Sequence, residues 1–545
     1  MIRCKMEKTG KAQRRIGKML SVLTASAALM ICGAVSAQAA GWTEENGNWY
    51  YYENSGSMAT DSWKRSEAGN LFYLGSDGTM QKDSVLEADG NYYYVNGDGV
   101  MVVNCWLKVD PSVIGEDGDE DVYMYFGSNG RAYKKSDSSN EAFSKRTING
   151  KTYAFNENGR MLTGFVTEEG EMISDDTEDP FTEAMYYFGE SDDGAMRMNG
   201  WYQYQEGSEA ESNVSGISYA DYETLWFYFG SGGKKVVPSS GKDTTEKTIN
   251  GQKYLFDENG VMLSSFVNPA SASSAASPSS IKYYSGALDG HLQKNKWIYA
   301  VPTEEMSETD YEDEQARWFY SGSSGTLYRD SIKKINGKRY VFDENGIMKS
   351  GFVLMDESGN YIGTLDREEI SKDDLLSGET ASLISGNALY YFGDSEDDGA
   401  MKTGKSVTIG LSDDSYTFGF SSAGKAYGTD GVESVSSRYY QNGLMLKADS
   451  DYKYGAVMLS DGTLAVVGTN GARQSGSKAL KDGNDAYVLM KDGKFYAYAE
   501  TDHKPVYYEG IYYEYDSDAE GKRGDEIAED TAGDTLPAEM KLNFD

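Results

Sequence analysis

Few residues in the 545-residue chain have the chemistry for nucleophilic or metal-assisted catalysis. The two histidines, His291 and His503, lie more than two hundred residues apart in sequence. A Ser-His-Asp relay or a zinc site needs a histidine held close to its partners, and this spacing indicates neither. Cys105 stands beside Trp106, and we interpret it as a small apolar packing residue rather than a nucleophile. We therefore expect no catalytic residues, no metal ion and no cofactor.

Acidic residues are numerous, but their spacing does not describe a site. The runs Gly115–Asp121 and Ser191–Gly194 could hold Ca²⁺ weakly, yet neither has the alternating ligands and closing Glu of an EF-hand. We interpret both as solvated loops and leave Ca²⁺ binding open. A carboxylate pair for glycoside hydrolysis needs a compact domain to hold it, and the sequence shows no non-repeat region of that size. We expect the protein not to be an enzyme.

The composition is that of an acidic, tyrosine-rich chain. Asp and Glu number 87 against 51 Lys and Arg, giving a formal charge of −36, and the chain has 62 Gly, 8 Pro and 43 Tyr. A disordered polyanion would lack the aromatic residues, and an α/β enzyme would carry more aliphatic core than a hydrophobic content of 39% allows. The acidic excess argues against a nucleic-acid partner, because phosphate binding needs Lys and Arg.

Residues 1–39 have the pattern of a signal peptide. Seven basic residues and one Glu precede an apolar run from Met19, which leads to the small-x-small sequence Ala37-Gln38-Ala39. Cleavage after Ala39 would leave the chain at −42, with Cys105 as its one cysteine and no internal disulfide. The alternative is an uncleaved membrane anchor. No later segment is long and apolar enough to span a bilayer.

Repeats of about 20 residues organise the chain from Gly41 onward. The first three read GWTEENGNWYYYENSGSMATDSW, GNLFYLGSDGTMQKDSV and DGNYYYVNGDGVMVVNCW, with anchors at Trp42, Trp63, Val85 and Trp106. Each has an aromatic run, a turn that contains Gly, an apolar residue and a second anchor, which predicts a β-hairpin. Since one hairpin cannot bury its own face, the series predicts an all-β fold, an elongated β-solenoid of stacked hairpins.

A longer period combines three kinds of hairpin. The first kind reads INGKTYAFNENGRMLTGF from Ile148, INGQKYLFDENGVMLSSF from Ile249 and INGKRYVFDENGIMKSGF from Ile335. Two acid-rich stretches interrupt the series, at Thr167–Glu183 and Glu304–Glu314, and neither contains a basic residue. We interpret both as surface loops inserted between hairpins, and Ser271–Ser280 as a flexible loop.

The repeats resemble the choline-binding, or cell-wall-binding, repeats of Gram-positive surface proteins. The INGKxYxFxENGxM units are also similar to the carbohydrate-binding repeats of large bacterial toxins and glucosyltransferases. The likeness covers roughly residues 41–447. It implies a β-solenoid. Composition and repeats together divide the chain into a signal peptide (1–39), N-terminal cell-wall-binding repeats (40–136), three-hairpin super-repeats with acidic insertions (137–447), degenerate β repeats (448–515) and an acidic disordered tail (516–545).

The resemblance also implies a ligand site, an aromatic cage between successive hairpins. Aromatic faces carry negative potential, so such a cage could surround a quaternary ammonium such as choline, and the same faces stack on sugar rings. For each aromatic position the alternative is a place in the core. The implied cage positions are Trp42, Trp49, Met58, Trp63, Tyr92, Trp106, Trp201, Trp226, Trp297 and Trp318.

These features predict a secreted, non-catalytic protein that attaches to the bacterial envelope, through choline-bearing polymer or glycan. The alternative with the same fold is an adhesin or toxin-like module that binds host or dietary glycans. A cell-wall hydrolase with its catalytic region after Lys447, and a structural spacer without ligand, are further alternatives. We expect localisation at the cell wall or cell surface and no membrane span in the mature chain; the oligomeric state stays open.

Overall fold

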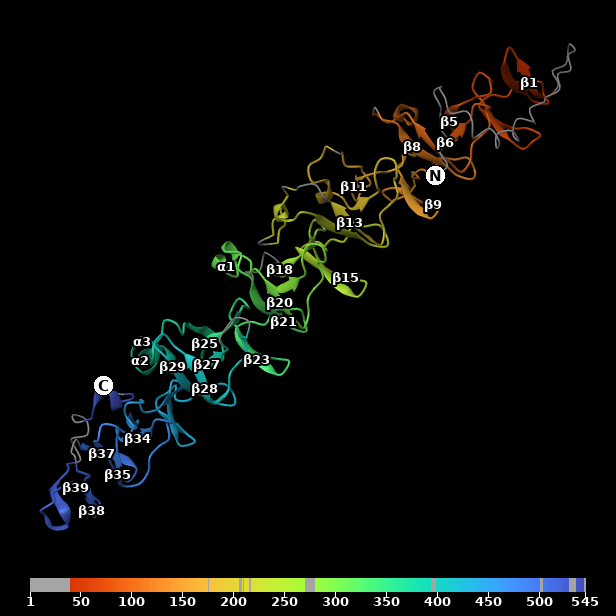
Figure 1. Cartoon of the computed structure of the whole chain (residues 1–545). Coiled ribbons are helices and arrows are strands. Elements are labelled where there is room, and N and C mark those ends of the chain that lie inside the picture. Colours follow the sequence, from red (N-terminus) through yellow and green to blue (C-terminus); the bar gives the residue numbers. More distant parts are fainter. Residues whose placement is uncertain are drawn as a thin grey trace, which may run out of the picture. The chain divides into compact units, whose positions relative to one another are not determined.

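The computed structural model describes residues 40–545, apart from 119, 137, 175, 205–207, 209, 215–216, 270–279, 394–397, 500–502, 529–535 and 544–545. The described chain is all-β, built from antiparallel strands in many small sheets with a few short helices (Figure 1). The predicted all-β class of hairpin sheets is confirmed, and the solenoid stays a prediction. The predicted signal peptide (1–39) and nearly all of the predicted Ser271–Ser280 loop lie outside the described residues.

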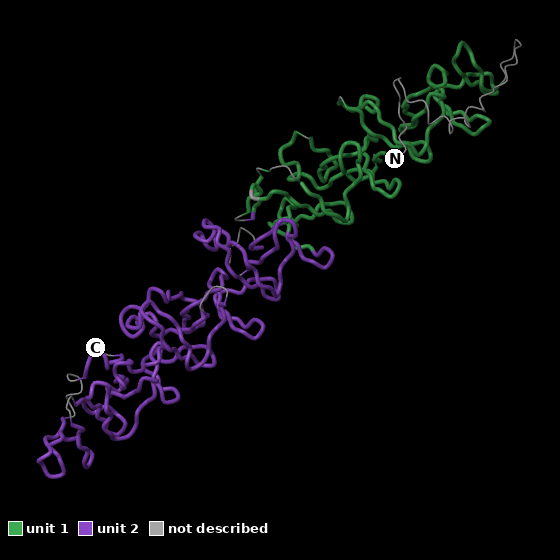
Figure 2. The backbone as a smooth tube through the Cα atoms, in the orientation of Figure 1, with its two compact units in different colours: residues 1–213, 217–247, 256–262 green, residues 214–216, 248–255, 263–545 purple. Residues whose placement is uncertain are grey.

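The chain divides into two compact units (Figure 2). Unit 1 comprises residues 1–213, 217–247 and 256–262, and unit 2 comprises residues 214–216, 248–255 and 263–545. The hairpins of unit 1 are β1 (Gly41–Glu45) with β2 (Asn48–Tyr52), β3 (Ser62–Arg65) with β4 (Leu71–Leu74), β5 (Ser84–Ala88) with β6 (Asn91–Val95), β7 (Cys105–Val109) with β8 (Val122–Phe126), β9 (Ser144–Ile148) with β10 (Lys151–Phe155), β11 (Phe165–Val166) with β12 (Tyr186–Tyr187), and β13 (Gly200–Tyr204) with β14 (Leu225–Phe229). Short 3-10 helices lie inside three of them: η2 (Pro111–Ile114), η3 (Pro180–Thr182) and η4 (Tyr219–Asp221).

The next strands, β15 (Thr244–Ile249), β16 (Gln252–Asp257) and β17 (Met262–Leu263), form a three-stranded sheet. Unit 2 continues with two hairpins, β18 (Ser265–Val267) with β19 (Lys282–Tyr284) and β20 (Lys296–Ala300) with β21 (Arg317–Ser321). Two three-stranded sheets follow, β22 (Ser331–Ile335), β23 (Lys338–Phe342) and β24 (Met348–Lys349), then β25 (Gly351–Met355) between β26 (Tyr361–Leu365) and β27 (Ala388–Phe392). The α-helices of the described residues are α1 (Glu308–Glu312), α2 (Lys372–Leu376) and α3 (Gly378–Ile384).

Larger sheets complete unit 2. One orders β28 (Gly404–Gly410), β29 (Ser415–Phe420), β32 (Leu444–Leu446), β31 (Arg438–Gln441) and β30 (Glu433–Val435). The next orders β33 (Tyr454–Met458), β34 (Leu464–Gly468), β37 (Lys494–Ala499), β36 (Tyr487–Lys491) and β35 (Lys478–Lys481). The last orders β38 (Val506–Tyr508), β39 (Ile511–Tyr515) and β40 (Arg523–Glu526). The 3-10 helix η6 (Glu520–Lys522) lies between β39 and β40, and η8 (Ala538–Met540) follows β40.

Asn-Gly turns join the two strands of several hairpins, whereas the Gly-containing turn of the predicted unit follows the aromatic strand and is closed by a single bridge such as Tyr52 to Met58. Between β9 and β10, Asn149 has a φ of 50° and Gly150 a φ of 81°. Two successive positive φ values give the two-residue turn whose twist matches a β-hairpin, and Asn and Gly adopt them at least cost. The turn sets the register Ile148 to Lys151, and the strands pair without interruption to Ser144 and Phe155.

A backbone hydrogen bond links each hairpin to the one before it. Each hairpin's second strand is followed by a further turn that contains Gly. The residue after this turn donates its backbone N–H, and a carbonyl near the start of the second strand of the preceding hairpin accepts it. In unit 1 these bonds run from Met80 to Trp49, Met101 to Leu71, Ala132 to Tyr92, Met161 to Tyr123, Met196 to Thr152 and Lys235 to Met185, at 2.8–2.9 Å. Unit 2 repeats the link, for example from Leu327 to Ile281 at 3.0 Å. We call this series the inter-hairpin ladder.

The apolar core lies between consecutive hairpins, as expected for units too small to bury a face alone. One core cluster joins Trp106 and Tyr125 of the β7–β8 hairpin to Ile148, Tyr153 and Phe155 of the β9–β10 hairpin. Each hairpin therefore depends on its neighbour for burial.

The acidic insertions differ from the prediction in two respects. Thr167–Glu183 lies between β11 and β12, and Glu304–Glu314 lies between β20 and β21, so each joins the two strands of one hairpin rather than successive hairpins. They also reach the core: Phe181 is fully buried and Met306 nearly so. A hairpin turn can lengthen without changing the register of its strands, and a single apolar side chain then anchors the long loop.

The predicted disordered tail needs a correction as well. Within residues 516–545, strand β40 pairs with β39, with Tyr513 opposite Glu526. Leu536 and Met540 pack in a core cluster with Ala456 of β33. Sparse apolar residues thus order part of a segment whose acidic composition suggested disorder. The other predicted domain boundaries stay predictions.

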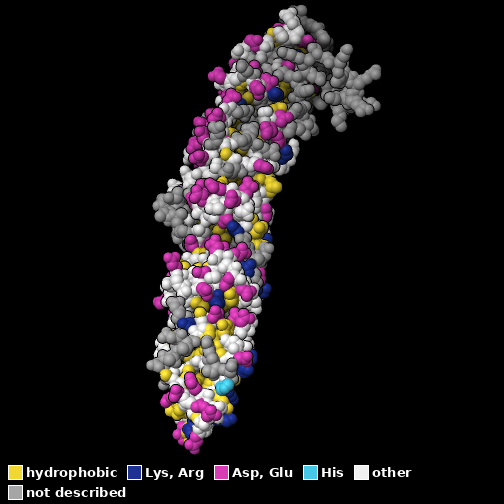
Figure 3. Space-filling model, turned by 60° about the vertical axis from the view of Figure 1, so that its left-hand side comes forward, with side chains coloured by type: hydrophobic (Ala, Val, Ile, Leu, Met, Phe, Trp, Pro, Cys, Tyr) yellow, Lys and Arg dark blue, Asp and Glu magenta, His cyan; other side chains and the backbone are white. Residues whose placement is uncertain are grey.

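Acidic side chains spread over the visible face in Figure 3, with fewer basic ones between them. None of the helices in the described part of the chain has the length and apolar character needed to cross a bilayer.

Candidate functional site

The strand pairing places the predicted cage residues on one face of each hairpin. In β1 and β2, Trp42 lies opposite Tyr51 and Glu44 lies opposite Trp49. Because side chains alternate between faces along a strand, these four share a face, and Tyr50 and Tyr52 occupy the other. The same register places Trp201 with Trp226 in β13 and β14, and Trp297 with Trp318 in β20 and β21. The predicted pairs of tryptophans are therefore neighbours in space.

The tryptophans of the first strands pack edge-on between two hairpins. The ring centroid of Trp63 lies 5.1 Å from that of Tyr73 in its own hairpin and 5.0 Å from that of Tyr93 in the next. Trp106 repeats this with Tyr125 and Tyr153 at 5.0 and 4.9 Å and is only 7% exposed. Its faces are covered, so the geometry of Trp106 is that of a core residue.

The N-terminal group is more open. Trp42 contacts Tyr51 at 5.4 Å and Phe72 of the next hairpin at 5.2 Å, both edge-on. Trp42 and Trp49 are both half-buried. Met58, also predicted as a cage wall, is 39% exposed. Trp42 and Trp49 share one face of the β1–β2 hairpin, and the Met58 side chain lies against Gly78 of the next hairpin. A cage formed by these three residues stays a prediction.

Tyr92 already has a cation over its ring. The Nζ of Lys134 lies 5.8 Å from the Tyr92 centroid, a cation–π contact supplied by the chain itself. Burial, followed by the nearby carboxylate of Glu87, raises the pKa of the Tyr92 hydroxyl. A ligand cation would have to displace Lys134 from this face.

In β13 and β14, the ring centroids of Trp201 and Trp226 lie 6.4 Å apart at 85°. Trp201 also stacks on Phe256 at 5.8 Å and meets Tyr228 edge-on at 5.2 Å. Trp201 is therefore held by aromatic contacts on two sides, and both tryptophans are half-buried.

The most open arrangement lies in β20 and β21. The rings of Trp297 and Trp318 stand at 90° with centroids 6.1 Å apart, and Tyr299 lies 4.8 Å from Trp318 at 39°. Tyr340 of β23 meets Trp297 at 4.8 Å. Tyr299 is 60% exposed, unusual for so large an aromatic side chain. We call these four residues the aromatic corner.

Sequence reasoning missed two kinds of residue at these positions. Tyr299 directly faces Trp318 across the hairpin, and the carboxylates of Glu44 and Glu87 face Trp49 and Tyr92. Counting back from the Asn-Gly turn would have identified Glu44 as the partner of Trp49. No comparable turn signal precedes Trp318, because an insertion separates its strand from that of Tyr299.

Lys235 occupies the ladder position where several hairpins carry methionine. Its ammonium is buried, donates a hydrogen bond to the Phe181 carbonyl and lies 5.5 Å from the Phe227 centroid. Burial lowers the pKa of Lys235 to about 7, an effect that Asp257 partly offsets. Burial also raises the pKa of Asp257 to about 6, and the Tyr219 hydroxyl donates a hydrogen bond to its carboxylate.

One histidine does meet a serine and an aspartate. Asp289 Oδ2 lies 2.8 Å from His291 Nδ1, and Ser285 Oγ lies 3.2 Å from the same nitrogen. A catalytic relay needs the carboxylate on one ring nitrogen and the nucleophile on the other, whereas here both meet Nδ1. His291 Nε2 instead faces Gln293. The group closes the turn between β19 and β20.

The acidic loops make contacts within the protein. Glu116 forms an ion pair with Arg160 at 3.1 Å and accepts a hydrogen bond from Asn158. In the described part of the chain, no group of three or more His, Cys, Asp or Glu residues is arranged to hold a metal ion. Cys105 is half-buried, and its thiol donates to the Trp106 carbonyl at 3.2 Å.

Comparison with known proteins identifies the repeats. A family model described as "Putative cell wall binding repeat" matches residues 40–58, 86–101 and 247–262. The first match contains β1, β2 and Met58, and the second contains β6 and Met101. The chain carries cell-wall-binding repeats. They supply the hairpins on which Trp42, Trp49 and Tyr92 lie.

The cell-wall-binding repeats are also similar in sequence to parts of much longer proteins. Glucosyltransferase-S of Streptococcus mutans serotype c is 26% identical over 318 residues, which is 58% of this chain and 16% of that protein. Glucosyltransferase-I of Streptococcus downei is 26% identical over 365 residues, 66% of this chain and 18% of that protein. This chain thus spans less than a fifth of the length of these curated relatives.

Solved structures with similar hairpins come from Streptococcus pneumoniae. CbpJ is 15% identical, with a TM-score of 0.32 over 71% of this chain and 99% of that chain. Choline binding protein F, determined in the presence of a tetrasaccharide-pentapeptide peptidoglycan analogue, is 16% identical, with a TM-score of 0.29 over 72% of this chain and 99% of that chain. At these scores the likeness carries no argument about function.

Proposed function

We propose that this chain is a secreted, non-catalytic protein that attaches to the bacterial envelope through aromatic sites between its hairpins. The target is a choline-bearing polymer or a glycan of the cell wall. Attachment is multivalent, since several weak sites on one chain raise the overall affinity without any single strong contact.

The aromatic corner is the observation that carries this proposal. Trp297 and Trp318 stand perpendicular, and the exposed ring of Tyr299 extends the surface beside Trp318. Perpendicular aromatic faces can contact a quaternary ammonium from two sides, and one open face can stack on a sugar ring. The matched cell-wall-binding repeats support the envelope as the target.

Charge narrows the choice of target. At a formal charge of −36, the chain would repel bare phosphate polymers such as an uncapped teichoic acid. A choline group or a neutral sugar meets no such repulsion. We therefore propose that the aromatic sites recognise cationic or neutral groups on the wall polymer.

Co-sedimentation with purified cell walls tests the proposal. Residues 40–545 should pellet with walls, and millimolar choline should release them if the ligand is a quaternary ammonium. The variant Tyr299→Ala/Trp318→Ala should lose a large part of the retention. Tyr311→Ala is the matched control, because Tyr311 is also an exposed aromatic residue of unit 2 but lies outside the aromatic corner. Equal retention of both variants and the parent chain would contradict a role for the corner.

A glycan of host or dietary origin is the second candidate target. The ring of Tyr299 is 60% exposed beside Trp318. Such an open aromatic face can stack on a sugar ring whichever polymer carries the sugar. Binding to a glycan array combined with indifference to choline would favour this candidate over a choline-bearing polymer.

A further inference from the structure

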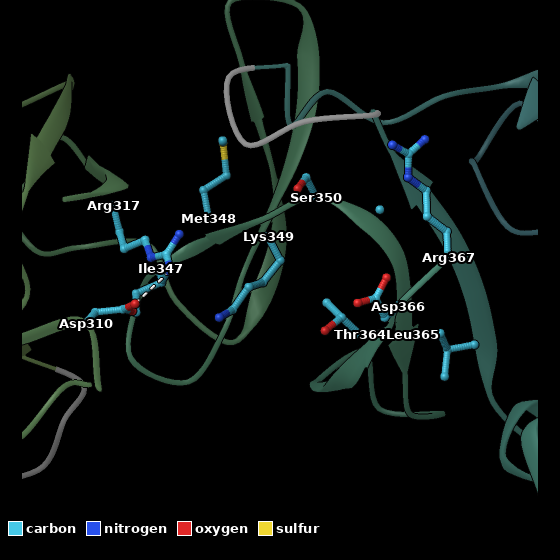
Figure 4. Close-up of a pocket in the computed structure, with 11 residues that line it drawn as sticks. Asp310, Arg317, Ile347, Met348, Lys349, Ser350, Thr364, Leu365, Asp366 and Arg367 are labelled. Carbon is cyan, nitrogen blue, oxygen red and sulfur yellow. Dashed lines mark hydrogen bonds and ion pairs between the residues drawn. The ribbon is translucent and has the colours of Figure 1, made fainter. Parts of the chain in front are cut away.

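A polar cavity of about 380 Å³ lies in unit 2, apart from the aromatic face of its hairpins. It falls within the size range of small-molecule sites, about 300–1,000 Å³. Arg317 of β21, Lys349 of β24 and Thr364 of β26 contribute to its lining, together with Asp310 and Asp366 (Figure 4).

Two departures from the repeat pattern create this cavity. Asp310 lies on α1, within the acidic insertion that joins β20 and β21. Thr364 lies on β26, the additional strand of the sheet formed by β25, β26 and β27. A regular two-stranded hairpin has neither element, so the cavity does not recur with the repeats.

One wall presents cationic donors held in place by carboxylates. The Arg317 guanidinium pairs with Asp310 at 2.7 Å, and the Lys349 ammonium pairs with the buried Asp343 at 2.9 Å. The hydrogen bond from Arg317 chiefly lowers the pKa of Asp310. Burial of Lys349 acts against its charge, but Asp343, together with Tyr361 and Asp310, offsets burial and raises the pKa of Lys349. Both shifts favour the charged forms of Asp310 and Lys349.

The other wall presents acceptors. Figure 4 shows Thr364 and Asp366 across the cavity from the Asp310–Arg317 pair, with the Lys349 side chain extending between the two groups. Thr364 and Asp366 are exposed. The backbone N–H of Glu368 donates to Asp366 Oδ1 at 2.8 Å, which fixes this carboxylate at its turn.

The charges of the site balance. Arg317, Lys349 and Arg367 are offset by Asp310 and Asp366, with Asp343 behind Lys349. An anionic ligand would meet already neutralised cations and the exposed Asp366. A hydroxyl group can accept from the cationic wall and donate to Asp366, so a neutral polyhydroxylated ligand fits both walls. Leu365 adds apolar lining for the C–H face of such a ligand.

We propose that this cavity binds a neutral mono- or disaccharide, with Arg317 and Lys349 donating to its oxygens and Asp366 and Thr364 on the opposite wall. The site is separate from the aromatic corner, so binding here does not depend on the wall-binding proposal.

Titration calorimetry of residues 40–545 with glucose, N-acetylglucosamine, isomaltose and chitobiose tests this inference. At least one of these sugars should bind with millimolar affinity. Asp366→Asn/Thr364→Ala should weaken that binding by about tenfold or more, since a charged hydrogen-bond acceptor and a hydroxyl are lost. Asn at 366 retains the turn, so the fold should survive. Glu369→Gln, an exposed neighbour that does not line the cavity, should bind as the parent chain does.

Three results would overturn the inference. One is that none of the four sugars binds at millimolar concentration. The second is that binding persists in Asp366→Asn/Thr364→Ala but is lost in Tyr299→Ala/Trp318→Ala, which would assign it to the aromatic corner. The third is that glucuronate binds more tightly than every neutral sugar. Wall retention of Asp366→Asn/Thr364→Ala should equal that of the parent chain, so this site and wall attachment can fail separately.

Discussion

The side chain of Met58 occupies the space that a β-carbon on Gly78 would need. Its Sδ lies 2.5 Å from the position where that β-carbon would stand, and Gly78 itself has a φ of +78°. Met58 follows the turn of the first hairpin unit, and Gly78 lies in the turn of the second. Because Gly78 has no side chain, the Met58 side chain can pack against this turn.

Gly78→Ala should therefore destabilise unit 1 more than Gly56→Ala does. Gly56 is the matched control, since it has a φ of +83° at the equivalent turn with nothing within 4 Å of its would-be β-carbon. A left-handed alanine costs about 1–2 kcal/mol at either position, and displacing Met58 should add about 1 kcal/mol. Urea denaturation measures both losses. Met58→Ala in the Gly78→Ala background should narrow the difference, and equal losses in the two single variants would contradict the close packing.

Lys235 should make stability depend on pH above neutrality. Its folded pKa of about 7 lies below the ordinary value of 10.5, so between these values the unfolded chain binds a proton that the folded chain lacks. The free energy of unfolding should rise with pH across this window, and Lys235→Met should remove that rise. Asp257, with a pKa of about 6, is already ionised there and adds no slope.

Denaturation curves at pH 7 and pH 10 for both chains measure this effect. Lys151→Met is the control, because Lys151 is exposed and paired with Asp193 at 2.9 Å. The hydrogen bond to Asp193 raises the pKa of Lys151, which gives a small effect of opposite sign. An unchanged pH dependence in Lys235→Met would mean that the ammonium is not buried in solution.

Trp106 and Trp318 should separate stability from binding. Trp106 is 7% exposed and enclosed by Tyr125, Tyr153 and Phe155, so Trp106→Ala should cost about 3–5 kcal/mol. Trp318 is half-buried, and Trp318→Ala should cost less while weakening retention on cell walls more. Thermal unfolding and wall co-sedimentation measure the two properties. If folded Trp106→Ala were retained on cell walls less than Trp318→Ala, Trp106 rather than Trp318 would be the residue that binds the wall.

Phe181 should show that an acidic insertion belongs to the core. Its ring is fully buried against Tyr204, Tyr219 and Phe227. Phe181→Ala should cost about 3–5 kcal/mol in urea denaturation, whereas Glu178→Ala, an exposed change in the same insertion, should stay within about 0.5 kcal/mol. Similar small effects from both changes would indicate that the insertion is a detached loop.

The hairpins could be predicted because their signals are local. The Asn149-Gly150 pair sets a turn, and the aromatic run that follows sets a strand. The burial of individual tryptophans could not be predicted in this way, because it depends on which hairpin packs next: Tyr153 covers Trp106, whereas Trp318 keeps an open side beside Tyr299. The contribution of the insertions to the core could not be predicted for a similar reason. A single apolar residue such as Phe181 gives no pattern among the acidic residues around it.

The inter-hairpin ladder gives the protein a direction. Every link in it is donated by the later hairpin and accepted by the earlier one, as from Met80 to Trp49. A hairpin with no successor therefore keeps an unpaired carbonyl at this position, and one with no predecessor keeps an unpaired N–H. The first and the last hairpin of a series thus offer opposite backbone groups to water or to an added strand.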